Sequence, residues 1–131
     1  MIFVDTNIFI YLIFPVDPQK YRACRFLFER ASKGEETLWT TEWVIAELIW
    51  FCHRKKKTRS DIKNILHKII STPGMIIRGK SYILEALQRW DDRVDYIDAW
   101  NIILLTEEDS IKGYSYDKGL DTVEDFVRVE P

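Results

Sequence analysis

The stretch from Trp43 to Cys52, WVIAELIWFC, is apolar at every position except one, and that exception is Glu47. Apolar side chains recur around Glu47 at helical spacing, which predicts a helix from Glu42 to about Lys55. A helix that is apolar almost all round has to be covered by other elements. We therefore expect this helix to lie at the centre of the fold.

Short apolar runs on both sides of this helix have the length and composition of β-strands. They are Ile2–Val4, Thr37–Thr40, Met75–Ile77, Lys112–Tyr116 and, near the carboxyl end, Phe126–Val129. Segments with helical periodicity separate them: a turn or two after Asp5 that Pro15 stops, Pro18 to Gly34 with Asp17 as N-cap, Ile62 to Ile70, Ser81 to Trp90, and Tyr96 to Leu105. This alternation predicts an α/β fold, with a mostly parallel sheet between helices on both faces.

Length and composition fit one domain spanning residues 1–131, because 47% of the residues are hydrophobic and no linker interrupts the pattern. The 19 Lys and Arg nearly balance the 21 Asp and Glu, which excludes a strongly basic nucleic-acid binder and requires any such binding to be local. Cys24 and Cys52 belong to no zinc-binding pattern and are expected to be buried free thiols. With neither a signal peptide nor a membrane span in the pattern, we expect a cytoplasmic protein.

Glu47 places a carboxylate in a helix face that we expect to be buried. Burying an unpaired carboxylate costs several kcal/mol, so Glu47 needs a cation, a proton or hydrogen-bond donors. The structural alternative is a salt bridge to a lysine or arginine elsewhere in the chain. A functional role is the favoured interpretation.

Two aspartates directly follow predicted strands. Asp5 follows the first strand, and Asp117 occupies the matching place after Lys112–Tyr116. Ligands of open parallel sheets bind at the carboxyl ends of the strands, which favours a site there. The alternative is an aspartate that caps the next helix or turn. Capping explains either residue alone, but explains the pair together with Glu47 less well.

Asp98 opens a late helix and has a strong structural alternative. Asp95 is a suitable N-cap, which places Asp98 at the third helical position, where a carboxylate is favourable against the helix dipole. However, Asp98 and Asn101 share one face of an otherwise apolar helix. This arrangement predicts a polar partner opposite that face.

Electrostatics connects these acids. Two carboxylates ~4 Å apart repel by about 4 kcal/mol at an effective dielectric constant of ~20, so three or four in one pocket require a cation. Oxygen ligands without histidine or cysteine favour Mg²⁺ or Mn²⁺ over zinc. Such a metal activates water and stabilises the charge that develops on a phosphate, so hydrolysis of phosphodiesters is the expected chemistry. The predicted ligands are Asp5, Glu47, Asp98 and Asp117.

Four short motifs in this order resemble those of PIN domains and, among these, the toxin ribonucleases of the VapC type. They are Val4-Asp5-Thr6-Asn7, Ala46-Glu47-Leu48, Ile97-Asp98-Ala99 and Ser115-Tyr116-Asp117-Lys118. The resemblance implies a three-layer α/β/α sandwich, cleavage of RNA by a Mg²⁺- or Mn²⁺-dependent endoribonuclease with one or two ions, a homodimer, and inhibition by a cognate antitoxin protein. It implies that Asp5, Glu47 and Asp98 are the core metal-binding acids and that Asp117 is a more variable fourth.

Further residues are expected to support these acids or to order a metal-bound water: Thr6, Asn7, Asn101, Ser115 and Asp121. Asp121 has a surface turn as its alternative. The chain departs from the family in two places. Trp100, Asn101 and Ile102 follow the third acid, where small residues are common, and Ser115 replaces a frequent threonine but keeps the hydroxyl.

Alternative functions stay open at this point. A catalytically silent PIN fold that binds RNA or protein is one, and a processing nuclease outside toxin–antitoxin systems is another. A phosphatase of the HAD type is weakened, because it needs a second aspartate where this chain has Asn7. A histidine-based ribonuclease is poorly supported, because His53 and His67 lie beside lysines and have no evident catalytic partner.

One dense basic run is the candidate for contacts with an RNA backbone: Arg54, Lys55, Lys56, Lys57 and Arg59. It lies about two helical turns beyond Glu47. The alternative is a solvated helix end whose charges complement the dipole. The tryptophans are able to stack bases, but their apolar surroundings favour a place in the core or in a dimer interface.

Overall fold

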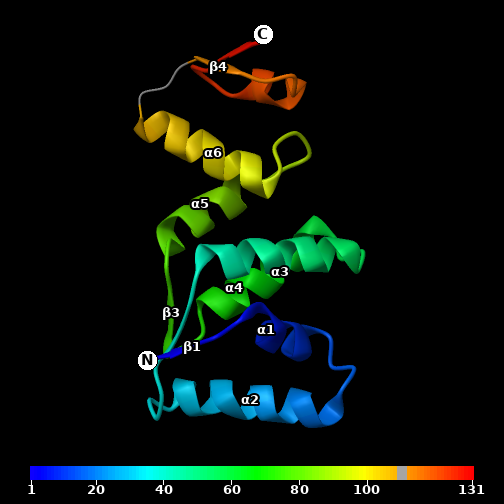
Figure 1. Cartoon of the computed structure of the whole chain (residues 1–131), viewed down its shortest axis with the longest axis vertical. Coiled ribbons are helices and arrows are strands. Elements are labelled where there is room, and N and C mark those ends of the chain that lie inside the picture. Colours follow the sequence, from blue (N-terminus) through cyan, green and yellow to red (C-terminus); the bar gives the residue numbers. More distant parts are fainter. Residues whose placement is uncertain (109–111) are drawn as a thin grey trace. The chain divides into compact units, whose positions relative to one another are not determined.

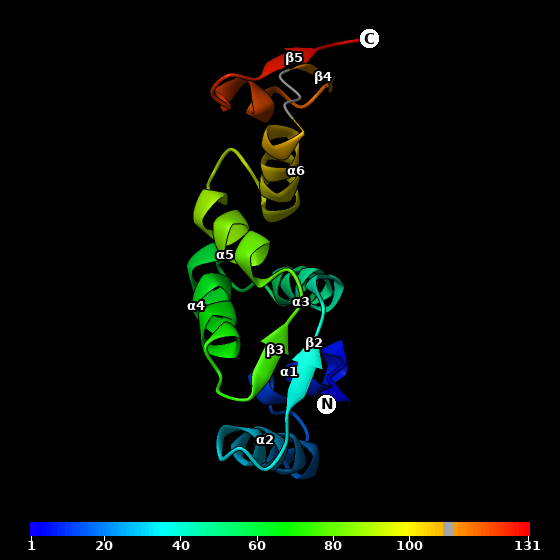
Figure 2. The same cartoon turned by 90° about the vertical axis from the view of Figure 1, so that its left-hand side faces the viewer.

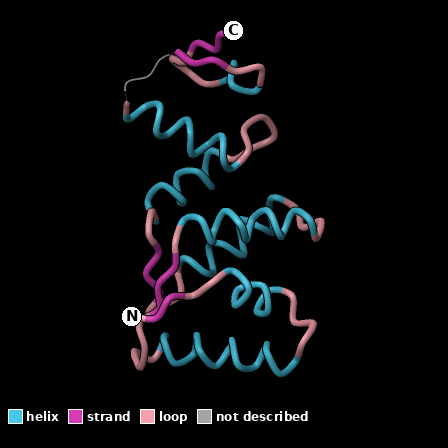
Figure 3. Tube along the Cα trace, viewed as in Figure 1, coloured by secondary structure: helices cyan, strands magenta, loops and turns pink. Residues whose placement is uncertain are grey.

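The structure is a computed structural model that describes residues 1–108 and 112–131 (Figure 1). Helices connected by short strands and loops make up most of the described chain (Figure 3). The chain divides into two compact units, residues 1–80 and residues 81–131. Each unit is described by itself.

A three-stranded parallel sheet organises the first unit. Its strands are β1 (Ile2–Phe3), β2 (Leu38–Thr40) and β3 (Met75–Ile77), and β2 lies in the middle. Leu38 is in register with both Ile2 and Met75. Figure 2 shows β2 and β3 side by side and pointing the same way. The parallel order follows from helical crossovers between successive strands.

The helices of this unit are α1 (Thr6–Ile13), α2 (Pro18–Ser32), α3 (Glu42–Arg54) and α4 (Arg59–Ile70). Several begin at a side chain that accepts hydrogen bonds from the first backbone N–H groups. Asp17 caps α2 as predicted, Thr41 caps α3 and Thr58 caps α4. These caps fix where each helix starts, and the cap at Thr41 also sets how the chain leaves β2 for α3.

One side of α3 belongs to the core, since Ile45 and Leu48 are completely buried there. The opposite side is not covered: Trp43 is 76% exposed and Trp50 is 59% exposed. The expectation that α3 is buried all round is therefore wrong. Tryptophan counts as apolar in a sequence pattern wherever it lies, so the pattern does not separate the buried face from the exposed one.

A turn before β3 brings two segments into close contact. Gly74 has φ +78°, and a Cβ placed on it would lie 2.4 Å from the carbonyl oxygen of Ala31 at the end of α2. Only glycine fits this position without strain. The carbonyl oxygen of Gly74 accepts a hydrogen bond of 2.8 Å from the backbone N–H of Leu38, so the turn also supports the middle strand.

The second unit contains α6 (Tyr96–Glu107), β4 (Lys112–Tyr114), the short 3₁₀ helix η1 (Lys118–Thr122) and β5 (Val127–Val129), and most of α5 (Lys80–Arg89). β4 and β5 pair in parallel. β4 ends two residues earlier than predicted, because Ser115 and Asp117 begin a local turn. Residues 109–111, between the predicted late helix and strand, lie outside the described part.

The predicted order of elements is confirmed, and so are the α/β class and the parallel strands. Cys24 and Cys52 are buried free thiols, as expected, and burial raises the pKa of both. Among the described residues, no helix is both long and apolar enough to cross a membrane.

Candidate metal centre

Asp5 lies just beyond β1 and is the N-cap residue of α1, as the position after a strand predicted. Its side chain accepts no capping hydrogen bond, and the residue is exposed. The capping alternative therefore does not account for its carboxylate. An exposed carboxylate at the end of a parallel strand is well placed to bind a ligand.

The side chain of Glu47 is held by Thr6, the residue that follows Asp5. The buried Thr6 hydroxyl donates a hydrogen bond of 2.9 Å to Oε2 of Glu47, which links the start of α1 to the middle of α3. The expectation of a buried Glu47 is wrong, because this residue is exposed on the α3 face that also carries the exposed tryptophans. The salt-bridge alternative also fails, since no ion pair of Glu47 is found within residues 1–108 and 112–131.

The backbone before Asp5 is fixed by a residue that the sequence pattern did not single out. The completely buried Thr40 hydroxyl donates a hydrogen bond of 2.9 Å to the carbonyl oxygen of Val4. The backbone N–H of Val4 donates to the carbonyl oxygen of Trp39 at 2.8 Å. Val4 is thus held on both sides, which sets the direction in which the chain leaves for Asp5.

In the second unit, Asp98 lies near two other acids. Asp95 caps α6 by accepting a hydrogen bond of 2.9 Å from the backbone N–H of Asp98, so the structural alternative for this helix start is correct. The Asp98 side chain nevertheless has its own environment. Burial raises its pKa, and the nearby carboxylates of Asp95 and Asp117 raise it further. The polar partner predicted opposite Asp98 is therefore Asp117.

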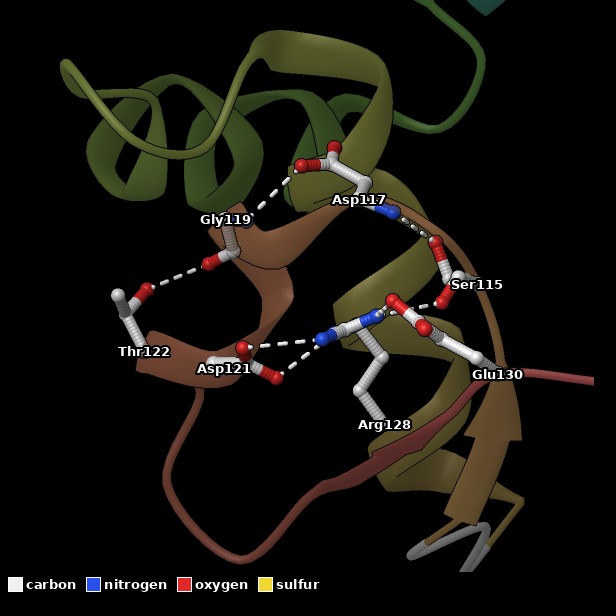
Figure 4. Close-up of polar contacts among 7 residues, drawn as sticks. All are labelled: Ser115, Asp117, Gly119, Asp121, Thr122, Arg128 and Glu130. Carbon is white, nitrogen blue, oxygen red and sulfur yellow. Dashed lines mark hydrogen bonds and ion pairs between the residues drawn. The ribbon is translucent and has the colours of Figure 1, made fainter.

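A tight turn presents Asp117 (Figure 4). Its backbone N–H donates to Oγ of Ser115 at 3.0 Å, and its Oδ1 accepts from the backbone N–H of Gly119 at 2.9 Å. A Cβ on Gly119 would lie 2.5 Å from the carbonyl oxygen of Arg93, so this turn needs glycine. Asp117 caps η1, as its structural alternative proposed, and also faces Asp98.

Asp121 is engaged elsewhere. Its two carboxylate oxygens accept hydrogen bonds from the Arg128 guanidinium at 2.8 and 3.3 Å, and this pairing lowers the pKa of Asp121 (Figure 4). The same guanidinium donates to the carbonyl oxygen of Ser115 and to Glu130, both at 2.8 Å. Arg128 therefore ties β5 to the turn that carries Asp117. Asp117 is the better candidate for a fourth ligand.

The remaining predicted residues are exposed or partly exposed. Asn7 lies in the first turn of α1, and Asn101 lies one turn beyond Asp98. The basic run spans the end of α3 and the start of α4: Arg54, Lys55, Lys56, Lys57 and Arg59. Thr40, Gly119 and Arg128 were not predicted. Gly119 follows an aspartate by two residues, a turn signal that the sequence offers, whereas Thr40 and Arg128 give no such signal.

Of the four predicted acids, Asp5 and Glu47 lie in residues 1–80, and Asp98 and Asp117 lie in residues 81–131. Over the described ranges, no group of three or more acidic, histidine or cysteine side chains lies within reach of one metal ion. Each pair offers carboxylate oxygens, the donors that Mg²⁺ and Mn²⁺ prefer. The acids that raise the pKa of Asp98 also make its surroundings favourable for a cation.

Comparison with known proteins identifies the family. A search among curated proteins returned no match. The family model described as PIN domain matches residues 2–125, which include all four acids and parts of both units. A match over nearly the whole chain agrees with the predicted α/β sandwich and with the parallel strands. The chain belongs to the PIN domain family.

Proposed function

We propose that this PIN domain is a metal-dependent endoribonuclease in which Asp5, Glu47, Asp98 and Asp117 hold one or two Mg²⁺ or Mn²⁺ ions. PIN domains are generally nucleases and typically use divalent metal ions. The observation that carries the proposal is the PIN domain match over residues 2–125, which contains all four acids, together with the hydrogen bond that orients Glu47. The family match includes parts of both units and all four acids, which supports treating the chain as one PIN domain.

Two of the four carboxylates have a hydrogen-bond donor that orients them. Thr6 holds Oε2 of Glu47, while Gly119 holds one oxygen of Asp117 and leaves the other for a ligand. Asp5 has an exposed carboxylate at a fixed strand end. When bound, the metal supplies an activated water and neutralises charge on the scissile phosphate. The side chains of this chain position the ion and compensate its charge.

We further propose that the enzyme is a toxin of the VapC type, acting as a homodimer and inhibited by a cognate antitoxin protein. The order of the four acid motifs supports this proposal. Induced expression is expected to arrest bacterial growth, and Asp5→Asn is expected to abolish the arrest. A short neighbouring reading frame that restores growth when expressed together with the protein would identify the antitoxin. Unimpaired growth at full expression of an RNA-cleaving protein would point to an RNA-processing nuclease instead.

The decisive experiment measures cleavage of a labelled structured RNA pool with Mg²⁺, Mn²⁺ or EDTA. Wild type is expected to cut only with metal, and Asp5→Asn and Asp117→Asn are expected to be inactive while still folded by circular dichroism. Asp121→Asn is the matched control. It also removes an exposed carboxylate near Asp117, but that carboxylate accepts hydrogen bonds from Arg128 and is not a proposed ligand. It is expected to retain activity.

Calorimetric titration with Mn²⁺ separates the alternatives. Loss of Mn²⁺ binding in both inactive variants supports the proposed ligands. Equal Mn²⁺ binding and equal cleavage by wild type, Asp5→Asn and Asp117→Asn would refute them. RNA binding without cleavage or metal binding would make a catalytically silent binding module the correct reading.

A further inference from the structure

The exposed face of α3 carries two tryptophans, one on either side of Glu47. Trp43, Glu47, Trp50 and Arg54 follow one another at intervals of four, three and four residues, so they share one face of the helix. Trp43 and Trp50 are 76% and 59% exposed and stand about 10 Å apart along the helix axis. Large exposed aromatic side chains of this kind mark a binding surface.

Positive charges lie over aromatic rings at the end of the same helix. The Arg54 guanidinium is 4.7 Å from the centre of the Trp50 ring, and the Lys55 ammonium is 5.6 Å from the centre of the Phe51 ring. In the loop that follows, the Lys57 ammonium is 5.6 Å from the ring of Phe14. Cation–π contacts hold these side chains in place, and the contact of Arg54 keeps its charge next to the exposed indole of Trp50.

We propose that this aromatic–cation face, formed by Trp43, Trp50, Arg54, Lys55 and Lys57, binds single-stranded RNA. Unpaired bases stack on Trp43 and Trp50, and backbone phosphates contact the cations. The inference rests on the proposed function, since it places the phosphate between two stacked bases beside Glu47. Duplex RNA is excluded as the preferred ligand, because its bases are already stacked on one another.

Charge distinguishes this face from another exposed aromatic. Phe26 on α2 is also 59% exposed and lies under a cation, with Arg30 5.9 Å from the ring centre. However, Arg30 forms ion pairs with Glu35 and Glu36, so its charge is neutralised locally. Phe26→Ala is therefore a matched control. It removes a ring as exposed as Trp50, but the neighbouring Arg30 is already paired with carboxylates and is not available to a phosphate.

The experiment measures binding of a fluorescent oligouridylate by anisotropy, in EDTA, so that no RNA is cleaved. Trp43→Ala and Trp50→Ala are each expected to weaken binding roughly 5- to 150-fold, the range for loss of one base–aromatic stack. Trp50→Phe is expected to retain most of the affinity. Arg54→Gln is expected to reduce the slope of log affinity against log salt by about 0.7, the value for one phosphate contact. Phe26→Ala is expected to change neither.

The outcomes separate this inference from the proposed function. If the tryptophan variants bind RNA and cleave it like wild type, the face does not bind RNA, although the metal nuclease stands. If they keep RNA affinity but lose dimerisation in sedimentation, the face is an interface between two copies, and the inference is wrong. If wild type binds RNA through the tryptophans but never cleaves it with metal, the inference stands and the proposed nuclease fails.

Discussion

The hydrogen bond from Thr6 to Glu47 makes Thr6→Val an informative substitution. Valine keeps the shape of the buried side chain and removes the hydroxyl that donates at 2.9 Å to Oε2 of Glu47. A hydrogen bond to a charged group contributes about 1.5–3 kcal/mol when both partners are buried. Glu47 is exposed and regains water, so we expect a loss of about 1 kcal/mol in the free energy of unfolding and about 3–5 °C in Tm.

The functional effect of Thr6→Val is expected to exceed the effect on stability. Without the hydroxyl, the Glu47 carboxylate is expected to exchange among rotamers and to hold the proposed metal ion less well. Loss of such a supporting hydrogen bond typically costs about 10- to 100-fold in metal affinity. Urea unfolding followed by circular dichroism measures the first effect, and Mn²⁺ titration of the same samples measures the second.

Thr6→Ser is the matched control, because serine keeps the donor and loses only a methyl group. We expect it to bind Mn²⁺ within a few-fold of wild type, although the missing methyl costs some stability, about 1 kcal/mol. The reasoning is refuted if Thr6→Val loses stability but binds Mn²⁺ and cleaves RNA like wild type. In that case the hydroxyl only stabilises the start of α1.

Three further predictions concern folding and titration. Gly74→Ala is expected to lower the free energy of unfolding by about 2–4 kcal/mol, from its positive φ and its clash with the end of α2, as urea titration will show. Arg128 lowers the pKa of Asp121, so this pair stabilises the fold above the unfolded pKa of Asp121, and that stability is lost as pH falls through the folded pKa. Asp121→Asn should therefore be less stable than wild type at neutral pH, and thermal melts should show the difference vanish in acid. Burial raises the pKa of Cys52, so a thiol reagent should modify it slowly in the native protein and rapidly in urea; equal rates would contradict its burial.

Local sequence patterns predicted the elements well, because their signals lie within a few residues of each other. Pro18 after Asp17 fixes the start of α2, and the turn ending at Gly74 fixes the start of β3. Glu47 shows the limit of this reasoning. Helical periodicity placed it among apolar residues, but tryptophan contributes to the pattern on an exposed face as strongly as on a buried one.

The supports of the site depend on contacts that span the sequence. Thr40 reaches Val4 across 36 positions, and Arg128 reaches Ser115 across 13. Nothing in the neighbourhood of either residue reveals its partner, so a pattern within one segment does not predict these contacts. The places of the four acids in the fold were predictable, because each follows a strand or interrupts an apolar helix, whereas their role as metal ligands stays a prediction. Asp117 was distinguished from Asp121 only by the guanidinium that engages the latter.

The family match ends at residue 125, before β5, although Arg128 on that strand holds the turn that presents Asp117. Synthesis runs from the amino end, so the turn receives this guanidinium only after residue 128 has left the ribosome. A nascent chain that already contains all four acids still lacks Arg128. The support of the turn that presents Asp117 is therefore completed later in synthesis than the four acids themselves.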